Sequence, residues 1–161
     1  MSDFYMAEIG IRQLQARYAD AVWRKDYRAF GECFTENAEW RIAGHVLQGR
    51  KKCVDLLAMF MDKFDRVRMT LQTPIIHMDS ENVTGRTDVI EHNILKDGQR
   101  NITIGNYYDR FVHEDGLWRF GWHYYQLYYL GAPDMSGKFY EIKDFGPPGT
   151  MPPINEPTMP L

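Results

Sequence analysis

The segment NYYDRFVHEDGLWRFGWHYYQLYY, residues 106–129, contains ten aromatic side chains in twenty-four positions, with one Asp-Gly turn in its middle. Asp-Gly between alternating runs is a strong short-range signal for a β-hairpin. A hairpin with one solvated face alternates apolar and polar residues. Here both alternating sets are aromatic, so both faces of the predicted hairpin have to be covered.

The two sets suggest what covers them. The odd positions hold Tyr107, Phe111, His123, Tyr125 and Tyr129, and the even positions hold Tyr108, Trp118, Phe120, Trp122, Tyr124 and Tyr128. We expect the odd face to line a cavity and the even face to pack against helices or a second subunit, because a broad apolar sheet face is rarely left in water. A solid core on both faces is the alternative. Six of the ten aromatic residues are tyrosines, whose hydroxyls need partners when buried, and this favours a partly wet pocket or interface.

Apolar spacing predicts helices in the first part of the chain. From Ala7 to Val22 apolar residues recur every three or four positions, and the segment 51–64 repeats this pattern. A short helix is expected after Asp26, a residue type that caps helix N-termini. The strand AEWRI, residues 38–42, is predicted between the short helix and the segment 51–64.

The rest of the chain reads as strands. We expect them over residues 66–77, 83–96, 100–113 and 117–130, separated by the turns DSEN, KDG and EDG. Helices followed by a long antiparallel meander predict an α+β fold, in which a curled sheet packs on the N-terminal helices as a cone with an internal cavity. We assign residues 1–130 to this domain. Residues 131–161 carry seven of the eight prolines and are expected to be an extension that packs on the domain or is partly disordered.

Length and charge narrow the possible partners. A chain of 161 residues is long enough to bury one core, and its net charge of −3 with scattered basic residues argues against nucleic acid or an anionic membrane surface as partner. No run of eighteen apolar residues is present, and the polar beginning MSDFYMAEIG does not resemble a signal peptide, so we expect a cytoplasmic protein. Neither CxxC nor HExxH spacing occurs, and no metal is expected.

The order of these elements resembles a known family. A helix, a short helix, an AEW strand, a helix led by GR, and strands with GNYYDRF and DGLWRF resemble the SnoaL-like group of the nuclear transport factor 2-like superfamily from Ile9 to Tyr129. The group includes ketosteroid isomerase, scytalone dehydratase, bile acid 7-alpha dehydratase and hexachlorocyclohexane dehydrochlorinase, and the tail FGPPGT looks most like the last of these. The resemblance implies a dimeric or trimeric α+β barrel whose apolar cavity performs proton transfers, eliminations or isomerisations without a cofactor.

The catalytic bases of the family do not carry over to this chain. The histidine of the dehydratases and the dehydrochlorinase aligns with Met69, and the carboxylate that orients it aligns with Trp23. The ketosteroid isomerase base aligns with Ile42. None of these three side chains accepts a proton at neutral pH, so the familiar His-carboxylate mechanism is expected to be absent.

Other family positions retain polar groups. Tyr18 aligns with a helix-one tyrosine that binds a substrate oxygen, and Tyr107 aligns with the second oxyanion donor of ketosteroid isomerase. The resemblance therefore implies an oxyanion pair of Tyr18 and Tyr107. For Tyr18 the alternative is an ordinary tyrosine on the buried stripe of its helix.

Three residues are candidate acids or bases. Glu91 falls where bile acid dehydratase has an aspartate, and desolvation beside Val89 and Ile90 would raise the pKa of Glu91 toward a range useful for a general base. The alternative is a solvated glutamate on the outer face of the sheet. His92 takes its place if the strand register slips by one residue. His123 is a further candidate, with a structural role as the alternative. The predicted pocket walls are Trp23, Trp40, Met69, Phe111 and Tyr125.

Two functions follow from these residues. The first is a cofactor-independent lyase, with dehydration favoured, or an isomerase of a small apolar substrate that is aromatic or polycyclic; carbon-carbon cleavage and cyclisation need similar groups. The second is a binding or accessory protein that keeps the cavity without a base. In both cases we expect a homodimer or homotrimer with an apolar small-molecule ligand.

Overall fold

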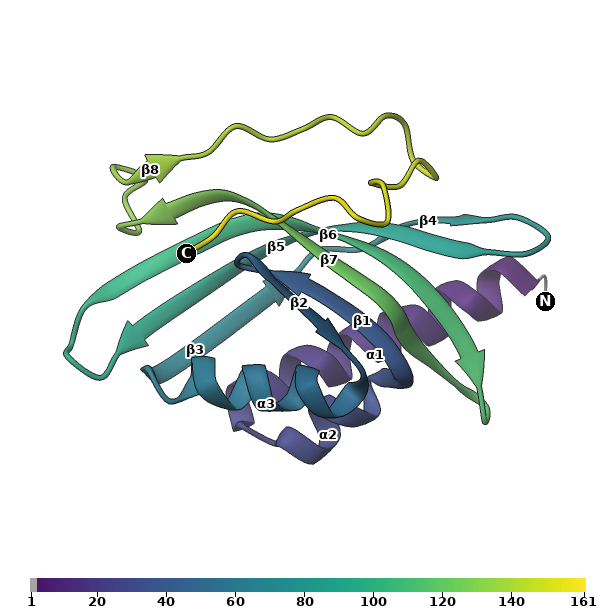
Figure 1. Cartoon of the computed structure of the whole chain (residues 1–161), viewed down its shortest axis with the longest axis horizontal. Coiled ribbons are helices and arrows are strands. Elements are labelled where there is room, and N and C mark those ends of the chain that lie inside the picture. Colours follow the sequence, from purple (N-terminus) through teal and green to yellow (C-terminus); the bar gives the residue numbers. More distant parts are fainter. Residues whose placement is uncertain (1–2) are drawn as a thin grey trace.

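Three helices pack on one face of a single curled sheet (Figure 1). The computed structural model describes residues 3–161. The helices are α1 (Asp3–Arg24), α2 (Tyr27–Glu32) and α3 (Arg50–Met61). Asp26 is the N-cap of α2, and its side chain accepts a hydrogen bond from the backbone N–H of Ala29, as its residue type predicts. Within residues 3–161, none of the helices combines the length and the apolar character needed to cross a bilayer.

The sheet has eight strands, and the predicted α+β class is confirmed. The strands are β1 (Phe34–Ile42), β2 (His45–Gln48), β3 (Phe64–Leu71), β4 (Ile75–Met78), β5 (Val83–Leu95), β6 (Arg100–Glu114), β7 (Leu117–Gly131) and β8 (Lys138–Phe139). Their order is β2-β1-β7-β6-β5-β3, with β4 beside β5 and β8 beside β7. The sheet is mixed, because β1 lies parallel to β7 while the other pairs are antiparallel.

The strand predicted over residues 66–77 is two strands in the structure. Strands β3 and β4 pair with successive parts of β5 and are separated by residues 72–74. Pro74 lies in this break, and its ring nitrogen has no hydrogen to donate to a neighbouring strand. The short strands β2 and β8 were not predicted, since four and two residues carry too little pattern to be recognised.

Two register shifts in β7 correct the predicted faces of the hairpin. Between β6 and β7, Arg110 pairs with Trp122 but Phe111 pairs with Phe120, so Gly121 is an extra residue that forms a bulge. The predicted parity is therefore reversed before Gly121, and Phe120 lies on the inner face in the main core. Trp118 also packs inward, since its ring approaches Gly10 of α1.

The second shift lies at the other end of β7. Ile104 pairs with Tyr129 and Gly105 with Leu127, which leaves Tyr128 unpaired. Tyr129 was expected to line the cavity. In the structure its ring packs against Phe139 of β8, with the ring centroids 4.8 Å apart.

The outer aromatic face is covered by the chain's own C-terminal segment rather than by helices. Tyr108, Trp122 and Tyr124 are buried on this face, with Phe145 and Met151 packed over them. We call these three residues the outer aromatic cluster. The segment runs back across the sheet (Figure 1).

Polar contacts hold this segment in place. The Tyr124 hydroxyl donates to the carbonyl of Pro157 at 3.2 Å, and the Arg41 guanidinium donates to the carbonyl of Glu156 at 3.2 Å. The backbone N–H of Gly44 donates to the hydroxyl of Thr158 at 2.8 Å. Together with Phe145 and Met151, these bonds fix the segment across the strands on which the outer aromatic cluster lies.

We predict that Phe145→Ala destabilises the fold by roughly 1–3 kcal/mol, because a half-buried ring is removed from the outer aromatic cluster. Urea denaturation followed by tryptophan fluorescence measures this, since Trp122 lies beneath the segment. Ile154→Ala is the matched control, because Ile154 is 57% exposed in the same segment. Equal effects of the two substitutions would contradict the role assigned to Phe145.

Candidate functional site

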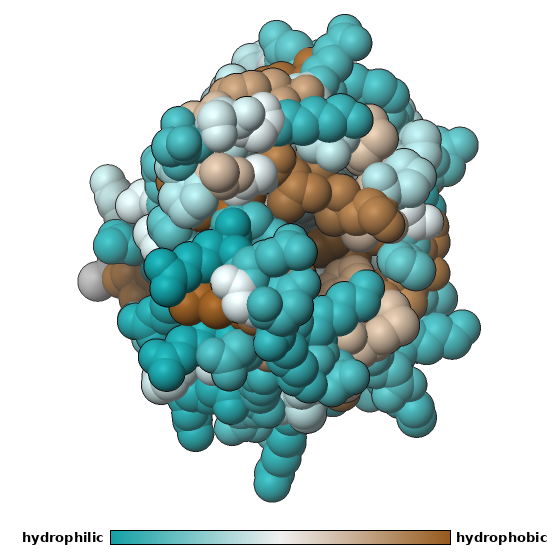
Figure 2. All heavy atoms as spheres, turned by 90° about the vertical axis from the view of Figure 1, so that its left-hand side faces the viewer, coloured by the Kyte–Doolittle hydropathy of each residue, from teal (hydrophilic) through white to brown (hydrophobic). Residues whose placement is uncertain are grey.

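A cavity of about 300 Å³ lies between the inner face of the sheet and helices α1 and α3. Its mouth is the apolar hollow in Figure 2, at the end of the molecule where β3 begins. The walls are mostly apolar, and Ile42, Leu57, Phe60, Phe64, Met69 and Leu130 contribute to them. A site of this size and lining suits a small ligand of one or two rings.

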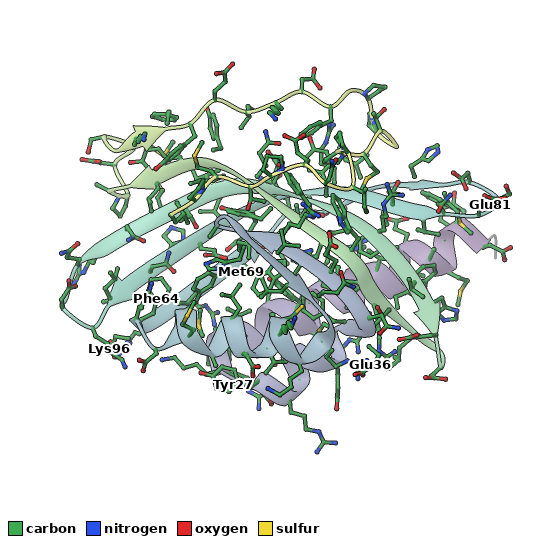
Figure 3. All side chains as sticks on the ribbon, in the orientation of Figure 1. Tyr27, Glu36, Phe64, Met69, Glu81 and Lys96 are labelled. Carbon is green, nitrogen blue, oxygen red and sulfur yellow. The ribbon has the colours of Figure 1, made fainter. Side chains whose placement is uncertain are left out.

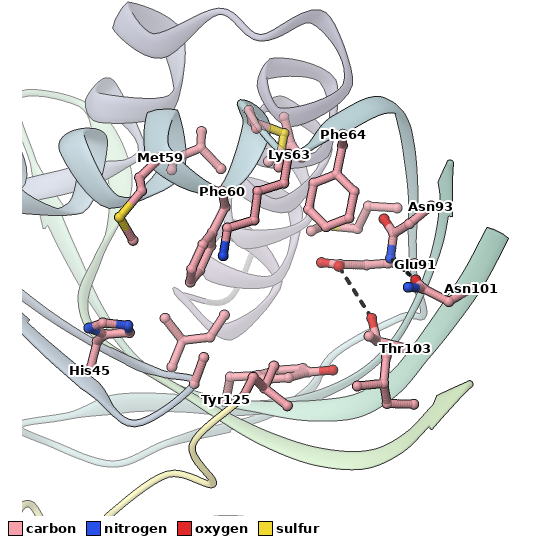
Figure 4. Close-up of a pocket in the computed structure, with 18 of the residues that line it drawn as sticks. His45, Met59, Phe60, Lys63, Phe64, Glu91, Asn93, Asn101, Thr103 and Tyr125 are labelled. Atoms are coloured by element: carbon pink, nitrogen blue, oxygen red, sulfur yellow. Dashed lines mark hydrogen bonds between the residues drawn. The ribbon is translucent and has the colours of Figure 1, made fainter. Parts of the chain in front are cut away.

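Glu91 is the acidic side chain of the cavity wall. It projects from β5 on the same side as Val89 and Asn93, because alternate residues of a strand share a face. The Thr103 hydroxyl of β6 donates to Glu91 Oε2 at 3.3 Å (Figure 4). Burial raises the pKa of Glu91 to about 6, and the hydrogen bond from Thr103 opposes this increase. A carboxyl with this pKa can exchange a proton near neutral pH.

Besides His123, which is described below, three residues predicted for the site lie outside the cavity wall. His92 is exposed on the opposite face of β5, so the register settles the choice between Glu91 and His92 in favour of Glu91 as the cavity residue. Trp23 is 47% exposed on α1, where the Arg68 guanidinium lies over its ring. Phe111 is buried beside Phe120 in the core and is absent from the cavity wall.

The structure places the other predicted wall residues in the cavity. Trp40, Met69 and Tyr125 all line it. Met69 is opposite Glu91 in the pairing of β3 with β5, and Thr103 is opposite Glu91 on the other side. The Tyr125 hydroxyl has no hydrogen-bond partner among the described residues, and burial raises its pKa.

Tyr18 and Tyr107 form the predicted pair of hydroxyls. They come from α1 and β6, both line the cavity, and their oxygens are 3.3 Å apart. Tyr18 lies on the buried stripe of α1, which places it against the inner face of the sheet. Burial raises the pKa of both tyrosines well above the usual value. Both therefore remain protonated at neutral pH and can donate hydrogen bonds.

His123 lies behind Tyr18 rather than in the cavity wall. Its Nε2 is 3.4 Å from the Tyr18 hydroxyl, and its ring stacks on Tyr107 with centroids 4.1 Å apart. Its Nδ1 forms a hydrogen bond with Asp109 Oδ1. Burial raises the pKa of Asp109, and the neighbouring His123 opposes this increase.

Asp109 is a partner that the sequence analysis did not identify. Asp109 and His123 are opposite each other in the β6–β7 register. That register could be inferred from the sequence only with the bulge at Gly121, because counting back from the Asp-Gly turn without it pairs Asp109 with Trp122.

The sequence also gave no signal for other polar residues of the cavity. Asn93 is buried, and its side-chain amide donates to Asn101 Oδ1 at 3.1 Å. Lys63 and His45 lie at the exposed mouth (Figure 4). Among residues 3–161 no three His, Cys, Asp or Glu side chains are grouped as metal ligands would be.

Comparisons with known proteins agree with this architecture. The family model described as a SnoaL-like domain matches residues 7–121. No curated protein matches the chain.

Solved structures share the fold at low identity. A hexachlorocyclohexane dehydrochlorinase (LinA) type 2 has a TM-score of 0.74 and 18% identity, over 91% of this chain and 97% of its own. A Novosphingobium aromaticivorans protein proposed to be a scytalone dehydratase has a TM-score of 0.74 and 19% identity, over 94% and 100%. The proposed beta subunit of an aromatic-ring-hydroxylating dioxygenase from the same species has a TM-score of 0.66 and 14% identity, over 76% and 90%. These identities show a common fold.

We predict that Glu91 makes the stability of the fold depend on pH. The pKa of its carboxyl rises from 4.5 to about 6 on folding, so the folded state binds this proton more tightly than the unfolded state. The contribution of Glu91 is therefore most favourable below pH 4.5 and decreases as pH rises through about 6, by roughly 2 kcal/mol. Glu91→Gln should remove this decrease, so the free energy of unfolding above about pH 7 should exceed that of the parent.

Urea denaturation of both proteins across this pH range measures the difference. Glu81→Gln is the control, because Glu81 lies at the β4–β5 turn, at the opposite end of the molecule from Phe64 (Figure 3). A Glu91→Gln profile parallel to that of the parent would contradict the burial argument.

Proposed function

We propose that this chain, which belongs to the SnoaL-like domain family of the nuclear transport factor 2-like superfamily, is a cofactor-independent lyase or isomerase. The observation that carries the proposal is a carboxyl with a pKa of about 6 on the wall of an apolar cavity that also holds two hydroxyl donors. Families of this fold that are represented among the structural relatives include a dehydrochlorinase, which supports an elimination.

In the proposed reaction Glu91 removes a proton from a carbon next to a carbonyl, phenol or leaving group. Tyr107 donates a hydrogen bond to the oxygen on which negative charge develops, and the Tyr18 hydroxyl supports Tyr107 from 3.3 Å away. A general base commonly increases the rate by a factor of about 10² to 10⁴. A single hydrogen-bond donor to the developing charge commonly contributes a factor of about 10² to 10³. Dehydration is the favoured outcome, and carbon-carbon cleavage or cyclisation would use the same groups.

The cavity supports a small, largely apolar substrate. A volume of about 300 Å³ is at the lower end for ligand sites, which favours one or two fused rings over a steroid. The rings of Trp40, Phe60 and Phe64 in the wall provide surfaces on which a planar ligand can stack.

A binding or accessory protein is the second candidate. Met69 and Ile42 line the cavity at positions where the resembling enzymes have their bases, and Trp23 points to solvent. The proposed dioxygenase beta subunit among the structural relatives carries the same fold. In this case the cavity would bind its ligand without removing a proton.

We further propose a homodimer or homotrimer. Phe4, Tyr5, Met6 and Ile9 are exposed together near the beginning of α1, and their burial between subunits would remove apolar area from water. Light scattering on the full chain should give two or three times the monomer mass of 19.0 kDa. A monomer mass at all concentrations would remove this proposal.

Exchange of carbon-bound hydrogen in D₂O separates the enzyme from the binding protein. We expect the protein to accelerate deuterium uptake into small bicyclic ketones such as 2-tetralone, measured by mass spectrometry. Glu91→Gln should reduce that rate by about 100-fold or more because the base is lost, with little change in ketone affinity.

Glu81→Gln, at the distant β4–β5 turn, should exchange at the parent rate. An unchanged rate in Glu91→Gln would remove Glu91 from the mechanism. Ketone binding by the parent protein without any accelerated exchange would favour the binding protein.

A further inference from the structure

A buried chain of hydrogen bonds connects β6 and β7 with the cavity. It runs from Asp109 Oδ1 to His123 Nδ1, from His123 Nε2 to the Tyr18 hydroxyl at 3.4 Å, and from there to the Tyr107 hydroxyl at 3.3 Å. Each of the four side chains is at most 2% exposed. A hydroxyl can donate or accept, so the direction of the chain depends on the protons held by the Asp109–His123 pair.

The pair can hold one proton or two on the three atoms that matter. With one proton, Asp109 is a carboxylate, His123 is neutral with hydrogen on Nδ1, and the pair has a net charge of −1. With two protons the pair is neutral overall, either as carboxylate and imidazolium or as carboxylic acid and imidazole. In both of these two-proton arrangements Nε2 carries a hydrogen. A proton on Asp109 Oδ2 instead is disfavoured, because that oxygen is buried without an acceptor among the described residues.

The surroundings of the pair favour the neutral, two-proton state. Asp109 is fully buried, and its Oδ2 has no hydrogen-bond partner among the described residues. A net charge without compensation is costly in such a place. Burial also raises the pKa of Asp109, which agrees with retention of the second proton.

The groups packed around the pair do not compensate a negative charge. Besides Tyr18 and Tyr107, the rings around His123 are Phe120 of β7 and Phe34 and Trp40 of β1. Glu91 of β5 adds negative charge near Tyr18 and Tyr107. The Cys33 thiol lies near Tyr18, and burial raises the pKa of this thiol to about 12 although Arg17 and Arg119 act on it in the opposite direction. The titratable or charged groups around the hydrogen-bond chain are therefore Tyr18, Cys33, Glu91, Tyr107 and Tyr125, with Arg17, Glu32 and Arg119 beside Cys33.

We propose that the Asp109–His123 pair directs the hydrogen bonds of Tyr18 and Tyr107 toward the cavity, so that the site selects a ligand with an acceptor oxygen at its inner end. Nε2–H donates to the Tyr18 oxygen, the Tyr18 hydroxyl donates to the Tyr107 oxygen, and the Tyr107 proton is free for the ligand. Donors that are aligned in one direction strengthen one another. Asp109 and His123 are positioning residues in this scheme, because they act through the tyrosines.

The opposite direction would select a different ligand. If Nε2 accepted from Tyr18, Tyr107 would donate to Tyr18 and present a lone pair to the cavity, which suits a ligand hydroxyl. With a neutral Asp109–His123 pair, the site is therefore expected to bind a ligand with a carbonyl, enolate or phenolate oxygen rather than an alcohol. This inference deepens the proposed function and rests on one part of it, namely that the cavity is the ligand site. It holds both for an enzyme and for a binding protein.

The proton on Nε2 can be observed directly in the unaltered protein. In ¹⁵N-histidine-labelled full chain, the Nε2 resonance of His123 should lie in the range of a protonated nitrogen around neutral pH. His45, His77, His92 and His113 are exposed and supply reference signals. Loss of the signal in His123→Phe assigns it. An Nε2 resonance in the range of an unprotonated nitrogen would overturn the proposal.

Ligand binding tests the consequence. The probe is 4-nitrophenol, whose absorbance distinguishes phenolate from phenol, and the matched ligand without an acidic proton is 4-nitroanisole. The paired replacement Asp109→Leu with His123→Phe keeps apolar volume and leaves no buried charge. We expect it to weaken phenolate binding by roughly tenfold to a hundredfold, because a hydrogen bond to a charged group is lost or misdirected. Its affinity for 4-nitroanisole should stay close to that of the parent.

A thermodynamic cycle separates positioning from packing. Tyr107→Phe alone should also weaken phenolate binding, and the paired replacement should then cost little more in that background, since both act through one hydroxyl. Equal losses for both probes, or full additivity of the two changes, would overturn the proposal. If neither probe binds, the assignment of the cavity as the ligand site is contradicted, and with it the proposed function. The resonance of His123 still decides the direction of the hydrogen-bond chain.

Discussion

The packing of Tyr18 between α1 and the curled sheet is the contact on which both the fold and the site depend. Its ring lies within about 6 Å of Phe30, Tyr107, Phe120 and His123, so one side chain joins the helical layer to the inner sheet face. Its hydroxyl is at the same time the middle of the hydrogen-bond chain to the cavity. The apolar ring fixes α1 against the sheet, and this fixed position holds the hydroxyl between His123 and Tyr107.

The aromatic hairpin shows how far patterns in the sequence lead. Alternation predicted that both faces needed cover, and the structure covers both, with helices inside and the C-terminal segment outside. The period of two could not reveal the bulge at Gly121 or the shift at Tyr128, because a bulge adds a residue without changing residue types in a recognisable way. For the same reason the partner of His123 was not found. Glu91 could be predicted, since a glutamate within an apolar strand is unusual, but its choice over His92 required the register that only the paired strands supply.

The polar groups of the cavity form two neighbouring sets, one that can accept a proton and one that can donate hydrogen bonds. Glu91, held by Thr103, is the group that can accept a proton near neutral pH. Tyr18 and Tyr107 keep their protons, because burial raises their pKa, so they can donate hydrogen bonds but do not act as bases. Burial thus moves the carboxyl and the phenols away from their usual behaviour in the same direction, since it disfavours the charged form of each. A single apolar environment accordingly produces a base with a raised pKa and donors that stay protonated, without a different device for each.

The Asp109–His123 pair is harder to explain as a source of stability. Removing two ionisable groups from water is costly, and an apolar pair could fill the same volume with equal or better stability. Asp109 also leaves one oxygen without a partner among residues 3–161. What an apolar pair could not provide is a donor aimed at Tyr18 from within the core. In the proposed neutral state the pair supplies this donor, because either arrangement of its two protons across Oδ1, Nδ1 and Nε2 leaves a hydrogen on Nε2. The physical effect that distinguishes the pair from leucine and phenylalanine is therefore the direction it gives to the tyrosine protons, and this connects an apparently unfavourable feature of the core with the chemistry of the cavity.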